Sequence, residues 1–386
     1  MKYFLCLLVL FFALARTEAQ YRVVFKVNKY PSAHSGDSIF VAGNFNNWNP
    51  GNKAYVFSYG NNDGFQFSTQ LAAGNYEYKC TRGSWRNVET QSDGKDIANR
   101  SFTLLSDTVF EISIEAWKDD FASAERKHTA SSNVRILDTA FRMPQLNRSR
   151  KIWIYLPEEY AKSKKHYPVL YMQDGQNIFD EYTSPFGEWG VDECLDSLIA
   201  KGKPACIVVG IENGPQRVNE YDPYDAERFG KGEGGAYLDF LTETLKPYID
   251  KNYRTLSAKE NTIIAGSSVG ALISYYAMLK RPDVFGKAGI FSPSFWLASP
   301  IKSLTDSLAG KINGKFFFYI GGKEGDSFIQ DVKDVQESLG EKSTAMIYSL
   351  FDANGSHNEE AWRKWFAEFY GFIMADGFNN VVKTKE

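Results

Sequence analysis

The segment that most constrains the fold is the apolar run 262–265, which leads into the pattern Gly266-x-Ser268-x-Gly270. The residues that follow, 271–279, have the composition of a helix. A serine between two glycines at a strand-to-helix turn stands clear of the backbone, because the glycines let strand and helix pass close by. The turn also aims the helix N-terminus at the place where an oxyanion would form. The pattern therefore predicts a nucleophilic Ser268, whereas the five letters alone also occur in ordinary loops.

A serine nucleophile needs a histidine base, and the chain has only four histidines. Three lie in polar stretches typical of a solvated surface: His34, His128 and His166. His357 differs, because it follows a predicted strand over 345–351 and precedes a predicted helix over 359–372. A base after a late strand, downstream of the serine, matches the order serine, acid, histidine of α/β-hydrolases. We therefore expect His357 to be the base.

The acid of such a triad should lie between Ser268 and His357, just beyond a strand. The run 316–320 predicts that strand, and Glu324 and Asp326 lie in the loop at its end. Asp326 directly precedes a helical pattern, which favours a role in helix capping. Glu324 is therefore the predicted acid, with Asp326 as the alternative.

Several further motifs accompany these residues. They are Tyr171-Met172-Gln173-Asp174-Gly175-Gln176-Asn177-Ile178-Phe179-Asp180, Trp189-Gly190-Val191-Asp192, Arg217-Val218-Asn219-Glu220-Tyr221-Asp222-Pro223, Ser292-Pro293-Ser294-Phe295-Trp296 and Gly355-Ser356-His357. From about residue 133 to 374 the chain thereby resembles the esterases of carbohydrate esterase family one and their siderophore-esterase relatives. The resemblance implies an α/β-hydrolase fold with Ser268, Glu324 and His357 as nucleophile, acid and base. The N–H of Val269, at the start of the helix, is expected in the oxyanion hole, and the resemblance adds the N–H of Gln176.

The resemblance also implies a substrate class, with one departure from the family pattern. Many feruloyl and acetylxylan esterases carry His-Gly-x-Gly-Gly after the third strand, where this chain has Asp-Gly-Gln-Asn at 174–177. That version is common in the siderophore-esterase branch and also occurs among polysaccharide esterases. We expect feruloyl or acetyl esters of plant polysaccharide as substrates, with a trilactone siderophore as the alternative. A catalytically inactive sugar-binding protein is the alternative from another class. No Cys/His spacing suggests a metal, and no cofactor is expected.

Length and turn signals predict two domains. A chain of 386 residues suits two domains better than one. Short alternating runs punctuated by Gly, Asn and Asp predict a separate all-β unit over 20–118, for which we expect an immunoglobulin-like β-sandwich. A polar linker is expected over 119–132, an esterase domain with a mostly parallel sheet over 133–376, and a polar tail over 377–386. The net charge of −3 gives no electrostatic footprint for nucleic acid.

The N-terminal unit carries a second resemblance. Its motifs are Val41-Ala42-Gly43-Asn44-Phe45-Asn46-Asn47-Trp48-Asn49-Pro50, Gly74-Asn75-Tyr76-Glu77-Tyr78-Lys79, Gly83-Ser84-Trp85 and Asp96-Ile97-Ala98-Asn99-Arg100. They resemble the glycogen- and starch-binding modules of carbohydrate-binding family forty-eight. By position, that likeness implies sugar contacts from Trp48, Lys79, Trp85 and Asn99. The alternative is a purely structural module whose tryptophans are packed inward.

The first 19 residues predict export. A basic start, an apolar stretch over 4–15 and small residues before Gln20 are typical of a cleaved signal peptide. About 12 apolar residues are too few for a membrane anchor, which needs roughly 20. We therefore expect a secreted or periplasmic protein with no membrane segment after cleavage. Cys80, Cys194 and Cys206 then remain, and buried free thiols are favoured, with a Cys194–Cys206 pair left open. The sequence predicts no oligomeric state.

Overall fold

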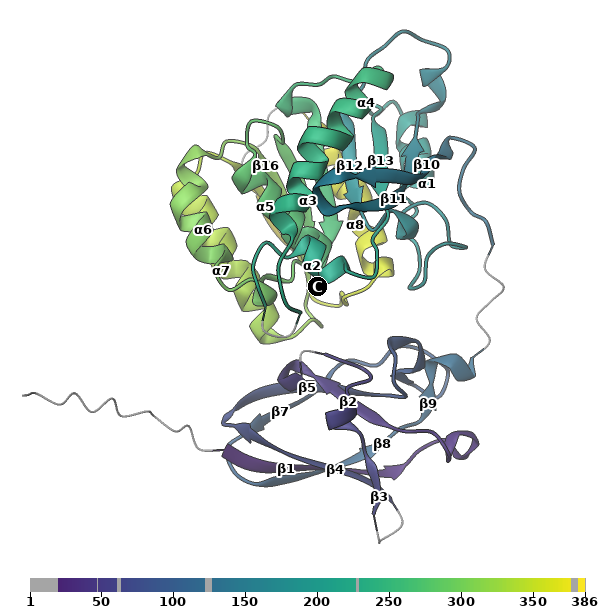
Figure 1. Ribbon diagram of the computed structural model, residues 1–386, viewed down its shortest axis with the longest axis vertical. Coiled ribbons are helices and arrows are strands. Elements are labelled where there is room, and N and C mark those ends of the chain that lie inside the picture. Colours follow the sequence, from purple (N-terminus) through teal and green to yellow (C-terminus); the bar gives the residue numbers. More distant parts are fainter. Residues whose placement is uncertain are drawn as a thin grey trace, which may run out of the picture. The chain divides into compact units, whose positions relative to one another are not determined.

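The chain forms two compact units, Met1–Ser123 and Ala124–Glu386, in a computed structural model (Figure 1). The structure describes residues 20–46, 48–60, 64–121, 127–226, 229–375 and 381–385. The predicted signal peptide, residues 1–19, lies outside the described residues. Each unit has a hydrophobic core of its own, so each is described separately.

The first unit is built from short β-strands, as expected. Its sheets have the orders β3-β4-β1-β8, β2-β5-β7 and β6-β9. All pairings are antiparallel except that of β1 with β8. The strands are β1 Gln20–Lys29, β2 Phe40–Gly43, β3 Ser58–Gly60, β4 Gly64–Ala72, β5 Gly74–Thr81, β6 Glu89–Thr90, β7 Arg100–Leu104, β8 Thr108–Ser113 and β9 Ala116–Trp117.

Aromatic side chains fill the core of this unit. Phe25 on β1 is fully buried and lies 4.9 Å from the ring of Tyr78 on β5 and 5.8 Å from that of Phe110 on β8. Strands from two sheets thus contribute rings to one core, which is the arrangement of a β-sandwich.

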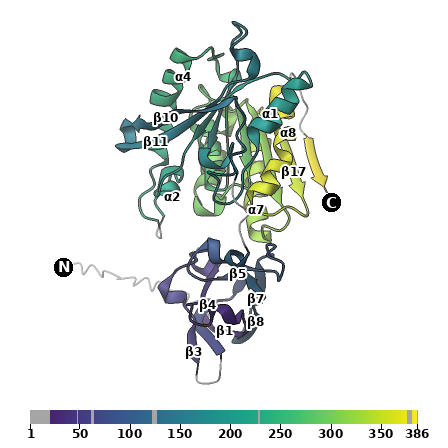
Figure 2. The ribbon, with the colours of Figure 1, turned by 90° about the vertical axis from the view of Figure 1, so that its right-hand side faces the viewer.

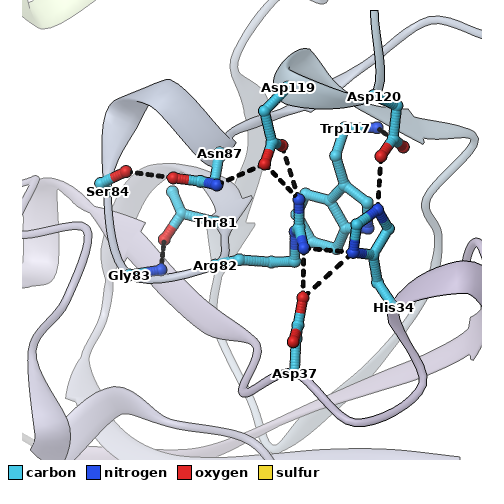
Figure 3. A network of polar contacts seen from close by, with 10 residues as sticks. All are labelled: His34, Asp37, Thr81, Arg82, Gly83, Ser84, Asn87, Trp117, Asp119 and Asp120. Carbon is cyan, nitrogen blue, oxygen red and sulfur yellow. Dashed lines mark hydrogen bonds and ion pairs between the residues drawn. The ribbon is translucent and has the colours of Figure 1, made fainter.

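The buried side chain of Arg82 binds the last described segment of the first unit, at Trp117 and Asp119 (Figure 3). The guanidinium of Arg82 lies over the buried ring of Trp117, 5.3 Å from its centroid, and binds both carboxylate oxygens of Asp119 at 2.6 Å. Asn87 donates to the same carboxylate at 2.6 Å. The bidentate geometry makes such a pair more stabilising than a single-contact surface ion pair.

His34 belongs to the same network, so its prediction as a solvated surface histidine is wrong. Its ring lies between the carboxylates of Asp37 and Asp120 and also contacts Arg82 (Figure 3). No local pattern predicts this network, because Arg82 and Asp120 lie 48 and 86 residues away from His34 along the chain.

The linker expected over 119–132 is divided between the two units. Asp119 and Asp120 bond to residues of the first unit. Thr129 and Ser131 bond to carboxylates of the second unit. The described part of this polar segment is therefore held at both ends by side-chain hydrogen bonds.

The second unit is organised around a nine-stranded sheet of order β10-β11-β13-β12-β14-β15-β16-β17-β18. Pairings from β13 to β18 are parallel, whereas β10 and β11 are antiparallel to each other and β11 to β13. The strands are β10 Val134–Met143, β11 Arg148–Tyr155, β12 Val169–Gln173, β13 Ile207–Ile211, β14 Thr262–Ser267, β15 Lys287–Phe291, β16 Lys315–Gly321, β17 Met346–Asp352 and β18 Val381–Lys385. The central strands are buried on both faces, which is why they read as unbroken apolar runs in the sequence.

Helices cover both faces of this sheet, which gives the α/β-hydrolase fold that the sequence predicted (Figures 1 and 2). Helices α1 and α8 pack on one face, and α3, α5 and α7 pack on the other. The helices are α1 Val191–Ala200, α2 Arg217–Tyr221, α3 Gly234–Asp239, α4 Lys246–Asn252, α5 Val269–Lys280, α6 Ile301–Leu308, α7 Asp326–Lys342 and α8 Glu359–Met374, with a π-helical segment, η9, at Phe240–Leu245.

The prediction of a polar tail over 377–386 is wrong for residues 381–385, because these residues form β18. This strand pairs in parallel with β17, from Tyr348↔Val381 to Asp352↔Lys385 (Figure 2). The edge of β17 offers unpaired N–H and C=O groups, and a short segment that begins with two β-branched valines can complete it.

Cys80, Cys194 and Cys206 are free thiols, so the open possibility of a Cys194–Cys206 bond is excluded. Burial raises the pKa of the Cys206 thiol to about 12, and a protonated thiol is inert. Among the described helices, none is both long and apolar enough to cross a membrane.

Candidate active site

Ser268 occupies a strained turn between β14 and α5. Its φ of 58° lies in the left-handed region, and it is the N-cap of α5. A Cβ on Gly266 would lie 2.6 Å from the carbonyl oxygen of Gly270, so the strand and helix can approach this closely only because residue 266 is glycine. Ser267 is buried, whereas Ser268 is partly exposed. The local geometry is that of the predicted nucleophile elbow.

The loop after β15 joins the elbow to the predicted acid. The hydroxyl oxygens of Ser294 and Ser268 lie 3.1 Å apart, and the Ser294 N–H donates to the Ser268 carbonyl. Two residues earlier, Ser292 donates its hydroxyl to Glu324 Oε1 at 2.7 Å. Because β14, β15 and β16 are adjacent parallel strands, the turns at their carboxyl ends come together at one edge of the sheet.

The structure brings Glu324, and not Asp326, to His357. Glu324 Oε2 lies 2.7 Å from His357 Nδ1, and its side chain is only 1% exposed. Its other oxygen accepts from the Gly321 N–H and the Ser292 hydroxyl, both at 2.7 Å. A carboxylate held in this way can orient an imidazole and stabilise its protonated form.

Asp326 is exposed and is the first residue of α7, whose N-cap is Gly325. No side-chain hydrogen bond caps this helix, so the predicted capping role of Asp326 is wrong. A carboxylate in the first turn still interacts favourably with the helix dipole.

The two predicted oxyanion donors lie on segments that touch. Val269 is the first residue of α5, and Gln176 lies in η8, a 3₁₀ turn at Gly175–Asn177 that follows β12. A Cβ on Gly270 would lie 3.0 Å from Asp174 Oδ2, so the turn after β12 packs against the start of α5. Helix N-termini and tight turns present free N–H groups, which is what an oxyanion hole requires.

An ion pair beside the elbow was missed by the sequence analysis. Asp174 accepts from Arg217 Nε at 2.7 Å and Nη2 at 2.8 Å, and from Asn213 Nδ2 at 2.5 Å. Burial alone would lower the pKa of Arg217, but the Asp174 carboxylate raises it overall, so the guanidinium stays charged. Arg217 also reaches the carbonyl of Ser267 at 3.4 Å. Both residues lie in motifs that carry the family resemblance, and this was the only signal that could have pointed to them.

Residues 143–372 match the family described as "Putative esterase". This span is more than half of the 386 residues. The chain belongs to this esterase family. It is 30% identical over 208 residues to the uncharacterized protein YbbA of Bacillus subtilis, covering 50% of this chain and 79% of that protein.

Two other similarities are informative about this esterase. It is 28% identical over 260 residues to an endo-1,4-beta-xylanase/feruloyl esterase of Xylanibacter ruminicola, covering 66% of this chain and 33% of that longer protein. The crystal structure of ferric enterobactin esterase from Salmonella typhimurium is similar over 92% of this chain and 93% of its own, with a TM-score of 0.51 and 15% identity. At that identity the second similarity shows the fold alone.

A buried carboxyl group, Glu359, joins the histidine loop of the esterase to the turn after β12. It is the first residue of α8, two positions after His357, and is 7% exposed. Asn177 Nδ2 donates to its Oε1 at 3.2 Å. The pKa of Glu359 is raised to about 7, chiefly by burial and also by the nearby Asp174 carboxylate, whereas His357 and Arg217 oppose the rise.

We expect Glu359→Gln to stabilise the fold at neutral pH, because it removes the free-energy cost of ionising a buried carboxyl group. Because the folded-state pKa is above the ordinary value of 4.5, folding is favoured most at low pH, and stability falls as the pH rises from about 4.5 to 7. Glutamine still accepts a hydrogen bond from Asn177 but carries no charge. Relative to the wild type, the variant should therefore gain on the order of 1–3 kcal/mol between pH 5 and pH 8. Thermal unfolding of both proteins at the two pH values measures this, and parallel pH dependences would contradict it.

In the first unit, the structure brings the two predicted sugar-contacting tryptophans together. The rings of Trp48 and Trp85 lie 6.2 Å apart at 44°, and both are half-buried. Lys79 on β5 and Asn99 before β7 flank the Tyr78–Arg100 pair of the β5–β7 ladder. Burial lowers the pKa of Lys79. Asn99 donates to Glu77 at 3.0 Å, so part of its hydrogen-bonding capacity is used within the unit.

Proposed function

We propose that this esterase hydrolyses carboxylic esters through an acyl-enzyme formed on Ser268. The observation that carries the proposal is the contact of the buried Glu324 carboxylate with the partly exposed His357, which the 292–294 loop joins to the strained turn of Ser268. A nucleophile, a base and an orienting acid are the three parts that acyl transfer requires. The assembled pair also argues against a catalytically inactive sugar-binding protein.

In this mechanism His357 takes the proton of Ser268, and the alkoxide attacks the ester carbonyl. The negative charge that develops on the carbonyl oxygen is stabilised by the N–H groups of Val269 and Gln176. His357 then gives its proton to the departing alcohol, while Glu324 holds the imidazolium. Water clears the acyl group by the same route in reverse. This chemistry needs no metal and no cofactor.

We propose esters on plant polysaccharide, feruloyl or acetyl, as the substrates. The similarity to a xylanase/feruloyl esterase supports this class, as does the tryptophan pair of the first unit. A polymeric substrate outside the cell also suits the export signal predicted over residues 1–19. The second candidate is a trilactone siderophore, favoured by the Asp-Gly-Gln-Asn sequence at 174–177.

A hydrolysis panel separates these candidates. Methyl ferulate, acetylated xylan, a trilactone siderophore and p-nitrophenyl acetate would each be offered to the wild type and to a Ser268→Ala control. We expect turnover of the ferulate or xylan ester with a kcat/KM at least about 10-fold above that for the trilactone. A preference for the trilactone would assign the enzyme to the second candidate, and no turnover of any ester would contradict the proposed reaction.

We further propose that the tryptophan pair holds polysaccharide chains. Aromatic rings suit the apolar C–H faces of sugars, but two half-buried rings contribute only a few kcal/mol before binding costs are subtracted. We expect Trp48→Ala with Trp85→Ala to slow hydrolysis of polymeric xylan esters several-fold and to leave p-nitrophenyl acetate unchanged, because tethering raises the local concentration of a polymer only. Equal effects on both substrates, with no retention of the protein on xylan or starch, would make the unit structural.

A further inference from the structure

The polar segment that enters the second unit is bound to a row of carboxylates. We call residues 128–133 the docking segment. His128 Nδ1 lies 2.8 Å from Asp180 Oδ2, and the Thr129 N–H donates to Asp180 Oδ1 at 3.1 Å. Farther along, the Ser131 N–H donates to Asp192 at 2.6 Å. A segment expected to be a free linker is thus fixed by side chains of the catalytic unit.

Thr129 is the centre of this contact. Its hydroxyl donates to Glu188 Oε2 at 2.8 Å and accepts from the Glu181 N–H at 2.8 Å. One side chain therefore binds both the turn that begins at Asp180 and a residue eight positions later. Burial alone would raise the pKa of Asp180, but the hydrogen bonds from His128 and from two backbone N–H groups hold it below the usual value.

Side chains of the turn that begins at Asp180 bind Gln176, the predicted oxyanion donor. The hydroxyls of Thr183 and Ser184 lie 2.7 and 3.1 Å from the carbonyl oxygen of Gln176, and both also reach the carbonyl of Asp180. Ser184 is 1% exposed, so water does not replace these bonds. The side-chain oxygen of Gln176 accepts from the Asn213 N–H at 3.2 Å. Hydrogen bonds within the protein therefore hold both the carbonyl and the side chain of Gln176.

We propose that the docking segment positions the oxyanion hole, with Thr129 and Ser184 as positioning residues for Gln176. The inference rests on the proposed function, because it takes the Gln176 N–H as an oxyanion donor. Oxyanion stabilisation depends steeply on geometry, since a donor must lie about 2.7–3.1 Å from the charge that develops. Loosening the turn at 180–184 would displace the donor without removing any group that reacts, and would lower kcat more than it raises KM.

The test compares Thr129→Val with Asn133→Ala in the full chain. Valine keeps the shape of threonine and its backbone N–H but loses both hydroxyl contacts. Asn133 belongs to the same segment, yet it donates to Asp196 on α1, a carboxylate that Tyr155 also binds. Both variants therefore remove side-chain hydrogen bonds that hold the docking segment, two in Thr129→Val and one in Asn133→Ala, but only those of Thr129 lead to the turn that holds Gln176.

For p-nitrophenyl acetate, we expect Thr129→Val to lower kcat per titrated active site by about 3–10-fold, with KM within about two-fold. Ser184→Ala, which acts directly on the Gln176 carbonyl, should lower kcat by about 10-fold or more. Thr129→Ser should restore the wild-type kcat, and Asn133→Ala should lower only the melting temperature.

An unchanged kcat in Thr129→Val and Ser184→Ala, or an equal loss in Asn133→Ala, would overturn the inference. If instead the wild type hydrolyses no ester and Ser268→Ala is indistinguishable from it, the proposed function fails and the inference fails with it. Loss of hydrolysis in Ser268→Ala together with an unchanged kcat in Thr129→Val and Ser184→Ala overturns the inference alone.

Discussion

Replacing Ser268 with alanine should abolish ester hydrolysis, with kcat falling on the order of 10⁴-fold or more. The side chain caps no N–H of α5, and the turn is held by backbone bonds such as that from the Ser268 N–H to the Phe291 carbonyl. The variant should therefore fold as the wild type does. Steady-state hydrolysis of p-nitrophenyl acetate, with thermal unfolding as the folding check, measures the effect.

Ser267→Ala is the matched control for the nucleophile. Ser267 is the last residue of β14 and is buried, so its hydroxyl is turned away from solvent. We expect this variant to keep most of the activity and to change stability by about 1 kcal/mol. Comparable losses of kcat in both variants would contradict the assignment of Ser268, rather than Ser267, as the nucleophile of this turn.

Glu324→Gln should lower kcat by about 10²–10⁴-fold. Oε1 of Glu324 accepts two hydrogen bonds, from the Gly321 N–H and the Ser292 hydroxyl. The amide oxygen of a glutamine would take that side, so its NH₂ group would face His357 Nδ1. The imidazole would then accept at Nδ1 and carry its proton on Nε2, which is the wrong tautomer for taking the proton of a serine. The kcat for p-nitrophenyl acetate, measured across pH, tests this.

Asp326→Asn is the control for the acid. Asp326 is exposed at the start of α7, so the loss of its charge should cost about 0.3–1 kcal/mol through the helix dipole and leave kcat within about two-fold. If Asp326→Asn loses the activity and Glu324→Gln retains it, Asp326 is the acid.

The parts of the fold that the sequence predicted are those with a strong local signal. The strands predicted at 262–265, 316–320 and 345–351 correspond to β14, β16 and β17, because the strands of a parallel sheet are buried and stand out as apolar runs bounded by polar loops. Strands β10 and β11 were missed. β10 lies at the edge of the sheet and is mostly exposed, so it offers neither an apolar run nor regular alternation.

Of the candidate site, the sequence by itself determined Ser268 and its turn, because the two glycines and the flanking strand and helix are contiguous. It also limited the acid to two residues. Only the tertiary structure shows which of the two lies beside His357, since the contact from Glu324 to His357 joins residues 33 positions apart. The same holds for Arg217 on Asp174, 43 positions apart, and for Asn177 on Glu359, 182 positions apart. Such pairs depend on which strands lie side by side in the sheet, and local sequence carries no record of that order.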